Sequence, residues 1–232
     1  MRKNQIALIK ARQAEEAQKT GTVSHQTARQ TGKTATAAHK QLAHFQAAMA
    51  ADLASLKALN TLDEKQAAKK TMLEKYRSFV NDYVSQAHNY PNSIAVQVMI
   101  WLLDTGDIEN GLNLGLHLAE QGQIMPVKFD RRDIETFLCD ALYDWANDLL
   151  KKQQSASPYL DILAAKLPEW GLHPAVTSKV YVMLAKHKKQ AHDWTACYQL
   201  CELAEQANPE GAGVKTLKAE AFTKTNSTGS LS

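Results

Sequence analysis

Hydrophobic residues recur along this chain at the spacing of helices and rarely alternate as they do in strands. Ile94, Val98, Trp101 and Leu102 recur at helical spacing, and Pro91 before them suits the first turn of a helix, where its missing N–H costs nothing. Valine and isoleucine are sparse, and no segment alternates convincingly between apolar and polar residues. The pattern therefore predicts an all-α protein.

A tight turn follows this first hydrophobic segment. Gly106 can adopt a positive φ, and the Asp107 carboxylate can cap the next helix. Gly111 and Gly115 each weaken that helix by about 1 kcal/mol relative to alanine. We therefore expect these two glycines to permit close approach of neighbouring helices, and we expect the segment as a whole to form a helical hairpin.

The same signals divide the rest of the chain into helices. We expect a short basic helix at 5–20, an Ala-rich helix at 34–59, a long helix at 63–88, and further helices at 92–103, 107–121, 131–152, 158–167, 174–189, 193–206 and 210–223. The Ala-rich helix carries apolar residues every three or four positions, a rhythm that favours a coiled-coil or helix-pair seam. These residues are Leu42, Phe45, Met49, Leu53 and Leu56.

The chain divides into four parts, in which long N-terminal helices precede a body of helical hairpins. We expect a flexible basic arm at 1–33, long oligomerisation helices at 34–88, a helical-hairpin body at 89–224 and a disordered polar tail at 225–232. The hairpins of the body resemble those of tetratricopeptide proteins, although two imperfect copies fall short of a full solenoid. The body is therefore expected to present protein-binding surfaces.

Charge is spread unevenly between these parts. Residues 1–50 hold eight Lys/Arg and two Asp/Glu, whereas residues 76–232 hold 14 Lys/Arg and 18 Asp/Glu, so an overall charge of +3 conceals a basic arm on an acidic body. Such asymmetry suggests a polyanion partner, and phosphate neutralisation by Lys and Arg supplies most non-specific DNA affinity. An ordinary solubilising extension would have a similar composition. The predicted DNA contacts are Arg2, Lys3, Lys10, Arg12, Lys19, Arg29, Lys33 and Lys40.

Several other classes of protein are disfavoured by the sequence. The longest uncharged apolar-rich run covers 11 residues, far below the roughly 20 that span a bilayer, so we expect no membrane association. Cys139, Cys197 and Cys201 form no even disulfide set and no zinc-ligand spacing, and we expect them to pack as small apolar residues. We therefore predict no resident metal.

A carboxylate stripe offers one alternative chemistry. Asp140, Asp144 and Asp148 are spaced four residues apart, so they share one face of the predicted helix at 131–152. Clustered carboxylates can bind Mg²⁺ for phosphodiester cleavage. The same spacing is also tolerated on a solvated helix face at a cost of a few tenths of a kcal/mol. These three residues are the only candidates for catalysis.

Short runs in the body resemble a known family. They are Val98-Met99-Ile100-Trp101, Leu103-Asp104-Thr105-Gly106-Asp107-Ile108, Gly111-Leu112 and Met125-Pro126, and in this order they resemble the small terminase subunit of peduovirus-type tailed phages. Lys128, Arg131 and Arg132 resemble the basic run after the family's Met-Pro. A further run, Ala212-Gly213-Val214-Lys215, resembles a motif near the family's C-terminal end.

The resemblance implies a role in packaging phage DNA. Small terminase subunits bind double-stranded viral DNA and work with a large ATPase subunit to initiate packaging and mature cohesive ends in the bacterial host cytoplasm. They generally form rings, and in this family the small subunit is often labelled the endonuclease subunit. The arm would then contact phosphates, with Lys128, Arg131 and Arg132 as a secondary basic patch.

Two other hypotheses stay open. The chain could itself be a metal-dependent endonuclease that uses the carboxylate stripe, in which case Mg²⁺ is its cofactor; otherwise we expect no cofactor. Alternatively, it could be a tetratricopeptide-like adaptor without a nucleic-acid role. The adaptor hypothesis predicts that no salt-sensitive DNA binding exists.

Overall fold

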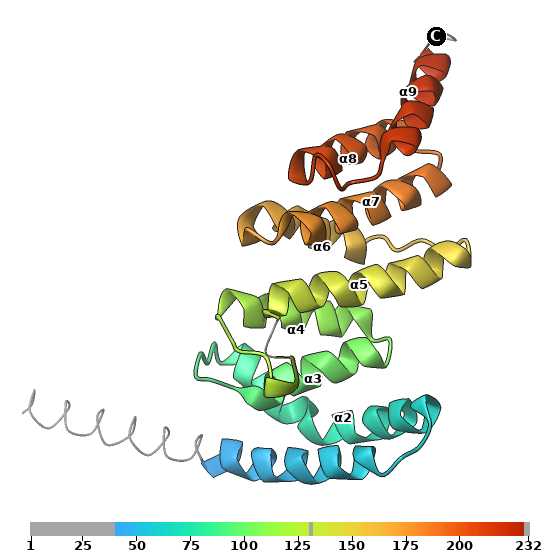
Figure 1. Cartoon of the computed structure of the whole chain (residues 1–232). Coiled ribbons are helices and arrows are strands. Elements are labelled where there is room, and N and C mark those ends of the chain that lie inside the picture. The colour runs from blue at the N-terminus through green and yellow to red at the C-terminus, as the bar shows by residue number, and fades with distance from the viewer. Residues whose placement is uncertain (1–39, 130–131, 230–232) are drawn as a thin grey trace, which may run out of the picture. The chain divides into compact units, whose positions relative to one another are not determined.

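The computed structural model describes residues 40–129 and 132–229, and most of these residues are helical (Figure 1). No strand occurs among them, so the all-α prediction is confirmed. The chain divides into two compact units, 1–51 and 52–232, and the boundary falls within a helix that spans 40–57. The predicted basic arm lies outside the described residues.

The second unit consists of successive helices joined by short turns. After the helix that ends at residue 57 come α2 (Leu62–Ser85), α3 (Ser93–Asp104), α4 (Ile108–Glu120), the 3₁₀ turn η1 (Val127–Phe129), α5 (Ile134–Lys151), α6 (Tyr159–Trp170), α7 (Pro174–Gln190), α8 (Trp194–Ala207) and α9 (Lys215–Gly229). Each helix from α2 to α9 packs against the next one along the chain, and α5 also packs against α7. Figure 1 shows this back-and-forth path, and it confirms a body of helical hairpins.

Side-chain caps set where many of these helices begin. At the start of α2, the Glu64 N–H donates to the Thr61 hydroxyl (3.2 Å) while the Thr61 N–H donates to the Glu64 carboxylate (3.0 Å). Asp107 caps α4 as predicted, and Asp133 and Asp193 cap α5 and α8 in the same way. A cap of this kind stabilises a helix by about 1 kcal/mol, so local sequence fixes these boundaries.

The two glycines of α4 bring three helices close together, as the sequence predicts. A Cβ added at Gly111 would lie 2.8 Å from the Leu103 side chain of α3. A Cβ added at Gly115 would lie 2.6 Å from the Leu138 side chain of α5 and 3.1 Å from the Met99 sulfur of α3. Real Cβ atoms essentially never come within 3.0 Å of a neighbour, as both leucine contacts would, and the Met99 contact is tighter than nine in ten real ones. The absence of a side chain at both positions therefore sets the spacing of α3, α4 and α5.

The C-terminal end differs from the sequence prediction in two respects. The last helix begins at Lys215 rather than near residue 210, because Gly213 adopts a φ of +67° just before it. It also continues to Gly229, so the disordered tail predicted from residue 225 is helical over its first five residues. The hydroxyls of Thr223, Thr225 and Ser227 donate to carbonyls four residues earlier at 2.8–2.9 Å, and these bonds satisfy the polar side chains within the helix.

The three cysteines are buried in helix interfaces, as predicted for small apolar residues. Burial raises the pKa of the Cys139 thiol and of the Cys201 thiol to about 12, and it also raises the pKa of Cys197. All three thiols are therefore protonated at neutral pH. In the described part of the chain, no helix is both long enough and apolar enough to cross a membrane.

Candidate functional site

A groove rimmed by lysines lies in the N-terminal half of the second unit. Its volume is about 400 Å³, and it is bounded by the end of the 40–57 helix, the start of α2, α3 and η1. Four lysines line it: Lys57, Lys65, Lys69 and Lys128. The other lining residues are largely apolar and include Trp101 and Phe129. We call this site the lysine groove.

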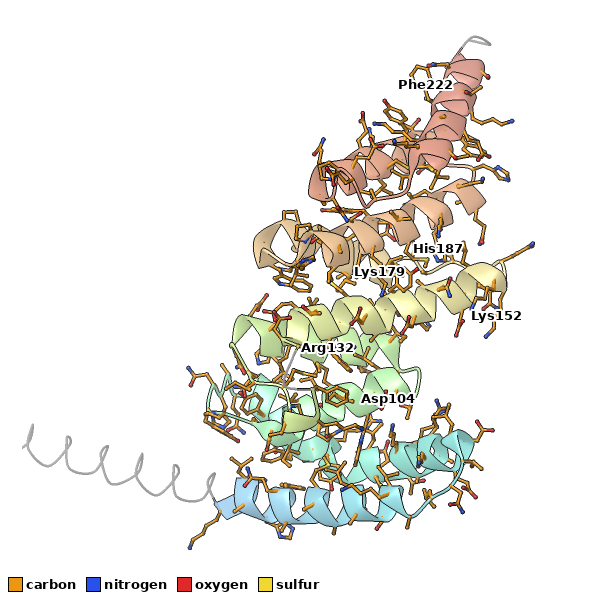
Figure 2. The ribbon with its side chains drawn as sticks, viewed as in Figure 1. Asp104, Arg132, Lys152, Lys179, His187 and Phe222 are labelled. Carbon is orange, nitrogen blue, oxygen red and sulfur yellow. The ribbon has the colours of Figure 1, made fainter. Side chains whose placement is uncertain are left out.

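One acid also lines the lysine groove, and it is neutralised within the site. The Lys69 Nζ atom lies 2.6 Å from the Asp104 carboxylate, and Figure 2 shows Asp104 at the end of α3. Lys57, Lys65 and Lys128 have no carboxylate within 4 Å among the described residues. Among the described lining residues, four lysines and one aspartate give a formal charge of +3, and three of these ammonium groups are available to a ligand.

A buried carboxylate holds the wall that carries Lys57. Asp52 is 7% exposed and lies five residues before Lys57 on the same helix. Its carboxylate accepts a hydrogen bond from the Tyr76 hydroxyl (2.8 Å) and pairs with Lys75 (2.7 Å). Burial, followed by the hydrogen bond to Asp52, raises the pKa of Tyr76, so its hydroxyl remains a donor. The Tyr76 ring in turn meets the buried Trp101 ring edge to face, which connects this wall to the floor of the lysine groove.

The predicted secondary basic patch is divided between two environments. The Lys128 ammonium lies 5.3 Å from the Phe129 ring centroid, at the rim of the lysine groove. Arg132 instead pairs with Asp140 at 3.1 Å. Arg131 lies outside the described residues. Among the predicted DNA contacts of the arm, only Lys40 is described; it is exposed at the first described position of the 40–57 helix.

The carboxylate stripe of α5 is placed as the sequence predicts, but its members have different partners. Asp140 pairs with both Arg132 (3.1 Å) and Lys179 (3.2 Å), and Figure 2 labels these two basic residues. Asp148 pairs with Lys151 at 3.0 Å, and Asp144 is exposed. Among residues 40–129 and 132–229, no three His, Cys, Asp or Glu side chains are grouped so that they could hold a metal ion.

A second groove lies between α2, α3 and α4. Its volume is about 450 Å³, its apolar lining includes Leu73, Val80 and Leu114, and its polar lining is mainly uncharged. We call it the amide groove because three asparagines line it: Asn81, Asn110 and Asn113. Arg77 also lines it, but this guanidinium pairs with Glu74 at 2.8 Å. The groove therefore suits a neutral or weakly charged partner.

Sequence reasoning missed both grooves. The lysines at positions 65 and 69 were visible one helical turn apart on the long helix predicted at 63–88, and this spacing was the available signal. Their charge was hidden because residues 51–75 hold five Lys/Arg and four Asp/Glu, which nearly cancel. Convergence with Lys57 and Lys128 depends on the packing of separate helices, which spacing alone does not reveal.

The chain is similar to known phage proteins over most of its length. A family model described as the phage small terminase subunit matches residues 46–173, a range that contains the whole lining of both grooves. The chain is 29% identical over 203 residues to the probable terminase, endonuclease subunit of Haemophilus phage HP1, covering 81% of this chain and 72% of that protein. It is 34% identical over 83 residues to the terminase, endonuclease subunit of Escherichia phage P2, covering 36% of this chain and 34% of that protein.

No solved structure matches the chain. The family match nevertheless covers more than half of its residues, and it includes the runs from Val98 to Pro126 that carry the resemblance seen in the sequence. The chain belongs to the phage small terminase subunit family, which acts in phage DNA packaging.

Proposed function

We propose that this chain binds double-stranded viral DNA and works with a large ATPase subunit to initiate packaging and cohesive-end maturation. The observation that carries the proposal is the charge asymmetry of a chain in this family: eight basic against two acidic residues at 1–50, and 14 against 18 at 76–232. Polyanion binding by such an arm is sequence-independent and salt-dependent. The arm brings DNA to the acidic helical body.

The remaining parts of the chain divide the other tasks. The helices at 34–88 mediate homo-oligomerisation into a ring, and the helical hairpins of 89–224 dock the large subunit. The mainly uncharged amide groove, where α2 meets α3 and α4 of the body, supports protein docking, because apolar grooves with a polar rim suit helices or loops of partner proteins. The protein acts in the cytoplasm of the bacterial host.

A titration with duplex DNA at two salt concentrations tests the DNA-binding role. We compare the full chain with a full-length variant in which the seven arm cations from Arg2 to Lys33 are replaced by glutamine. The expected result is salt-steep binding by the wild type and its loss in the variant. A variant with Lys70, Lys152 and Lys186 replaced by glutamine serves as the control for exposed lysines elsewhere. Absence of duplex binding by the wild type would favour the adaptor hypothesis.

The endonuclease hypothesis is a second candidate because both relatives bear the term endonuclease subunit in their names. In this chain it rests on Asp140, Asp144 and Asp148 with Mg²⁺ supplied from solution. The exposed Asp144 is the best position for a test, because it makes no ion pair with any described residue. The variant Asp144→Asn should abolish Mg²⁺-dependent nicking of phage DNA and leave DNA binding intact. Nicking by this variant at the wild-type rate would refute the endonuclease hypothesis.

A further inference from the structure

The lysine groove is not part of the basic arm, and the proposed function leaves it unused. We infer that it binds a single-stranded nucleic-acid segment, with phosphates at Lys57, Lys65 and Lys128 and a base against the apolar floor at Phe129. This inference rests on the proposed DNA-binding function for the identity of the polyanion. It adds a second contact on the folded body, separate from the arm.

Charge is the first argument. Lys57 and Lys128 are exposed and Lys65 is partly exposed, and each comes from a different segment of the second unit. Their ammonium groups face one concavity whose acid, Asp104, is already paired with Lys69 at 2.6 Å. An anion that enters the groove therefore meets three available cations and no unpaired carboxylate among the described lining residues. Each phosphate that they neutralise releases counterions, which favours binding.

Shape is the second argument. A concavity of about 400 Å³ lies in the size range of pockets that enclose small ligands. A duplex presents its phosphates on a convex surface and keeps its bases stacked inside. Only an unpaired nucleotide can direct its base into such a pocket while its phosphates remain at the rim. The volume and the apolar floor therefore favour a single strand over a duplex.

The third argument is the chemistry of the floor. Phe129 is half-buried and meets Phe137 edge to face at 5.4 Å, which holds the ring in place while leaving part of it accessible. The Lys128 ammonium lies over the same ring, 5.3 Å from its centroid, and its flexible stem can move aside to contact a phosphate. An aromatic surface flanked by cations is the usual construction of sites that bind single strands without regard to sequence.

The cations of the groove suit a phosphate backbone. All four basic side chains among its described lining residues are lysines. The planar fork of arginine pairs with both oxygens of a carboxylate or of a phosphate, so the type of cation does not by itself separate the two anions. Lysine is a point charge on a flexible stem and binds phosphates in many proteins. An acidic protein segment is the alternative that the experiment below distinguishes.

The test uses a fluorescein-labelled 20-nucleotide oligothymidine and a labelled 20-base-pair duplex, titrated with the full chain over a range of salt. A triple variant with Lys57, Lys65 and Lys128 changed to glutamine is expected to bind oligothymidine about tenfold more weakly or worse, with a salt slope reduced by about 2. The matched control replaces Lys70, Lys152 and Lys186, which carry the same total charge outside the groove. This control is expected to retain the wild-type slope for oligothymidine.

A single variant, Phe129→Leu, tests the role of the aromatic floor. It keeps an apolar side chain and all charges, so it is expected to weaken oligothymidine about fivefold or more while leaving the duplex unchanged. Circular dichroism checks that each variant remains helical. A folded groove variant whose oligothymidine binding equals that of the control overturns the inference. So does an unchanged affinity in Phe129→Leu, which would indicate a contact with phosphates alone.

The failure of this inference can be distinguished from the failure of the proposed function. If duplex binding is lost in the arm variant but every groove variant behaves as wild type, the proposed function stands and the inference fails. If the wild type binds neither oligonucleotide, both fail. A labelled poly-glutamate peptide tests the alternative occupant. If this peptide binds, if the groove variant abolishes its binding and if oligothymidine does not displace it, the groove binds an acidic protein segment and the inference is overturned.

Discussion

Two grooves of similar size use the same pair of helices and differ mainly in the polar groups at their rims. Lys65 and Lys69 at the start of α2 face the lysine groove, whereas Leu73 and Val80 farther along α2 face the amide groove. Both floors are apolar, but one rim carries ammonium groups without carboxylate partners and the other carries amides. The comparison indicates that the packed helices supply the concavity, while a few rim residues decide the class of partner.

The largest effect is expected from a variant that crowds the contact between α3 and α4, because α4 lines only one of the two grooves. The variant Gly111→Val places its Cβ 2.8 Å from the Leu103 side chain and 3.2 Å from the Leu103 backbone nitrogen, so the Leu103 side chain must repack or α3 and α4 must move apart. We expect a loss of about 3 kcal/mol in the free energy of unfolding, measured by urea denaturation. The amide groove, which α4 lines, should change shape, whereas the lysine groove has no lining residue from α4.

The matched control for this overpacking is Asn113→Val, which adds the same side chain to an exposed position of the same helix. Its cost should stay below about 0.7 kcal/mol, the range of ordinary helix propensity. Equal stability of the two valine variants would show that the close approach at Gly111 is not important for the fold.

Replacing the buried Asp52 should loosen the lysine groove and leave the amide groove unchanged. Asp52→Ala deletes the acceptor that receives the Tyr76 hydroxyl at 2.8 Å and the partner of Lys75. We expect a loss of about 2 kcal/mol by urea denaturation, since hydrogen bonds to charged groups are the stronger ones. The wall that carries Lys57 should loosen, and oligothymidine binding should weaken with it. Asp52→Asn keeps an acceptor and should cost less; an equal cost would argue against this role.

Lower pH should reduce the stability of the second unit through a residue that lines neither groove. His187 on α7 is buried, its Nε2 lies 2.9 Å from the Ala146 carbonyl oxygen, and its Nδ1 has no hydrogen-bond partner. Burial lowers the pKa of His187, an effect only partly opposed by that hydrogen bond and by Asp161. As the pH drops below about 6.5, the ordinary pKa of histidine, the unfolded chain takes up a proton at His187 while the folded chain does not. The free energy of unfolding therefore decreases as the pH drops, until the pH is low enough to protonate the folded state too.

Thermal unfolding at pH 7.5 and pH 5.5 measures this effect of His187. The variant His187→Gln cannot take up the proton, so it should lose less stability on acidification than the wild type does. The same loss in both proteins would assign the pH dependence to other groups. Oligothymidine binding by the folded protein should be equal in the variant and the wild type at pH 7.5, because His187 lines neither groove.

The smallest change in stability should come from neutralising the acid of the lysine groove. Asp104→Asn removes the partner of Lys69 from a half-exposed ion pair, which is worth at most about 1 kcal/mol. It also frees a fourth ammonium group, so oligothymidine binding should become tighter and its salt slope steeper by about 0.7. The control is Asp144→Asn, which makes the same change on α5. Weaker binding in Asp104→Asn would contradict the assignment of the groove.

The sequence predicted the helices well because most of their boundaries depend on nearby residues. Asp107 caps the helix that follows it, and Gly111 and Gly115 lie where helices approach closely; both properties can be inferred from spacing. The last helix extends to Gly229, five residues into the predicted tail, because Ser and Thr hydroxyls can bond within a helix as well as end one.

The candidate sites were harder to predict for a different reason. The carboxylates of α5 share a helix face, as 3.6-residue periodicity requires, but spacing could not show that Arg132 and Lys179 both pair with Asp140. Similarly, Lys57 and Lys128 are 71 positions apart in the numbering and meet at one groove only through tertiary packing. Periodicity identifies faces of single helices; it does not identify which faces meet.

The three buried thiols give this protein internal probes of its own local opening. Because Cys139 lies on α5 and the other two lie on α8, a water-soluble disulfide reagent can reach each group only when that helix separates from its neighbours. The rate of modification would then rank the two regions by their opening free energies without any introduced label. A partner that clamps the α4–α5 layer would slow the reaction at Cys139 and leave the α8 thiols unaffected.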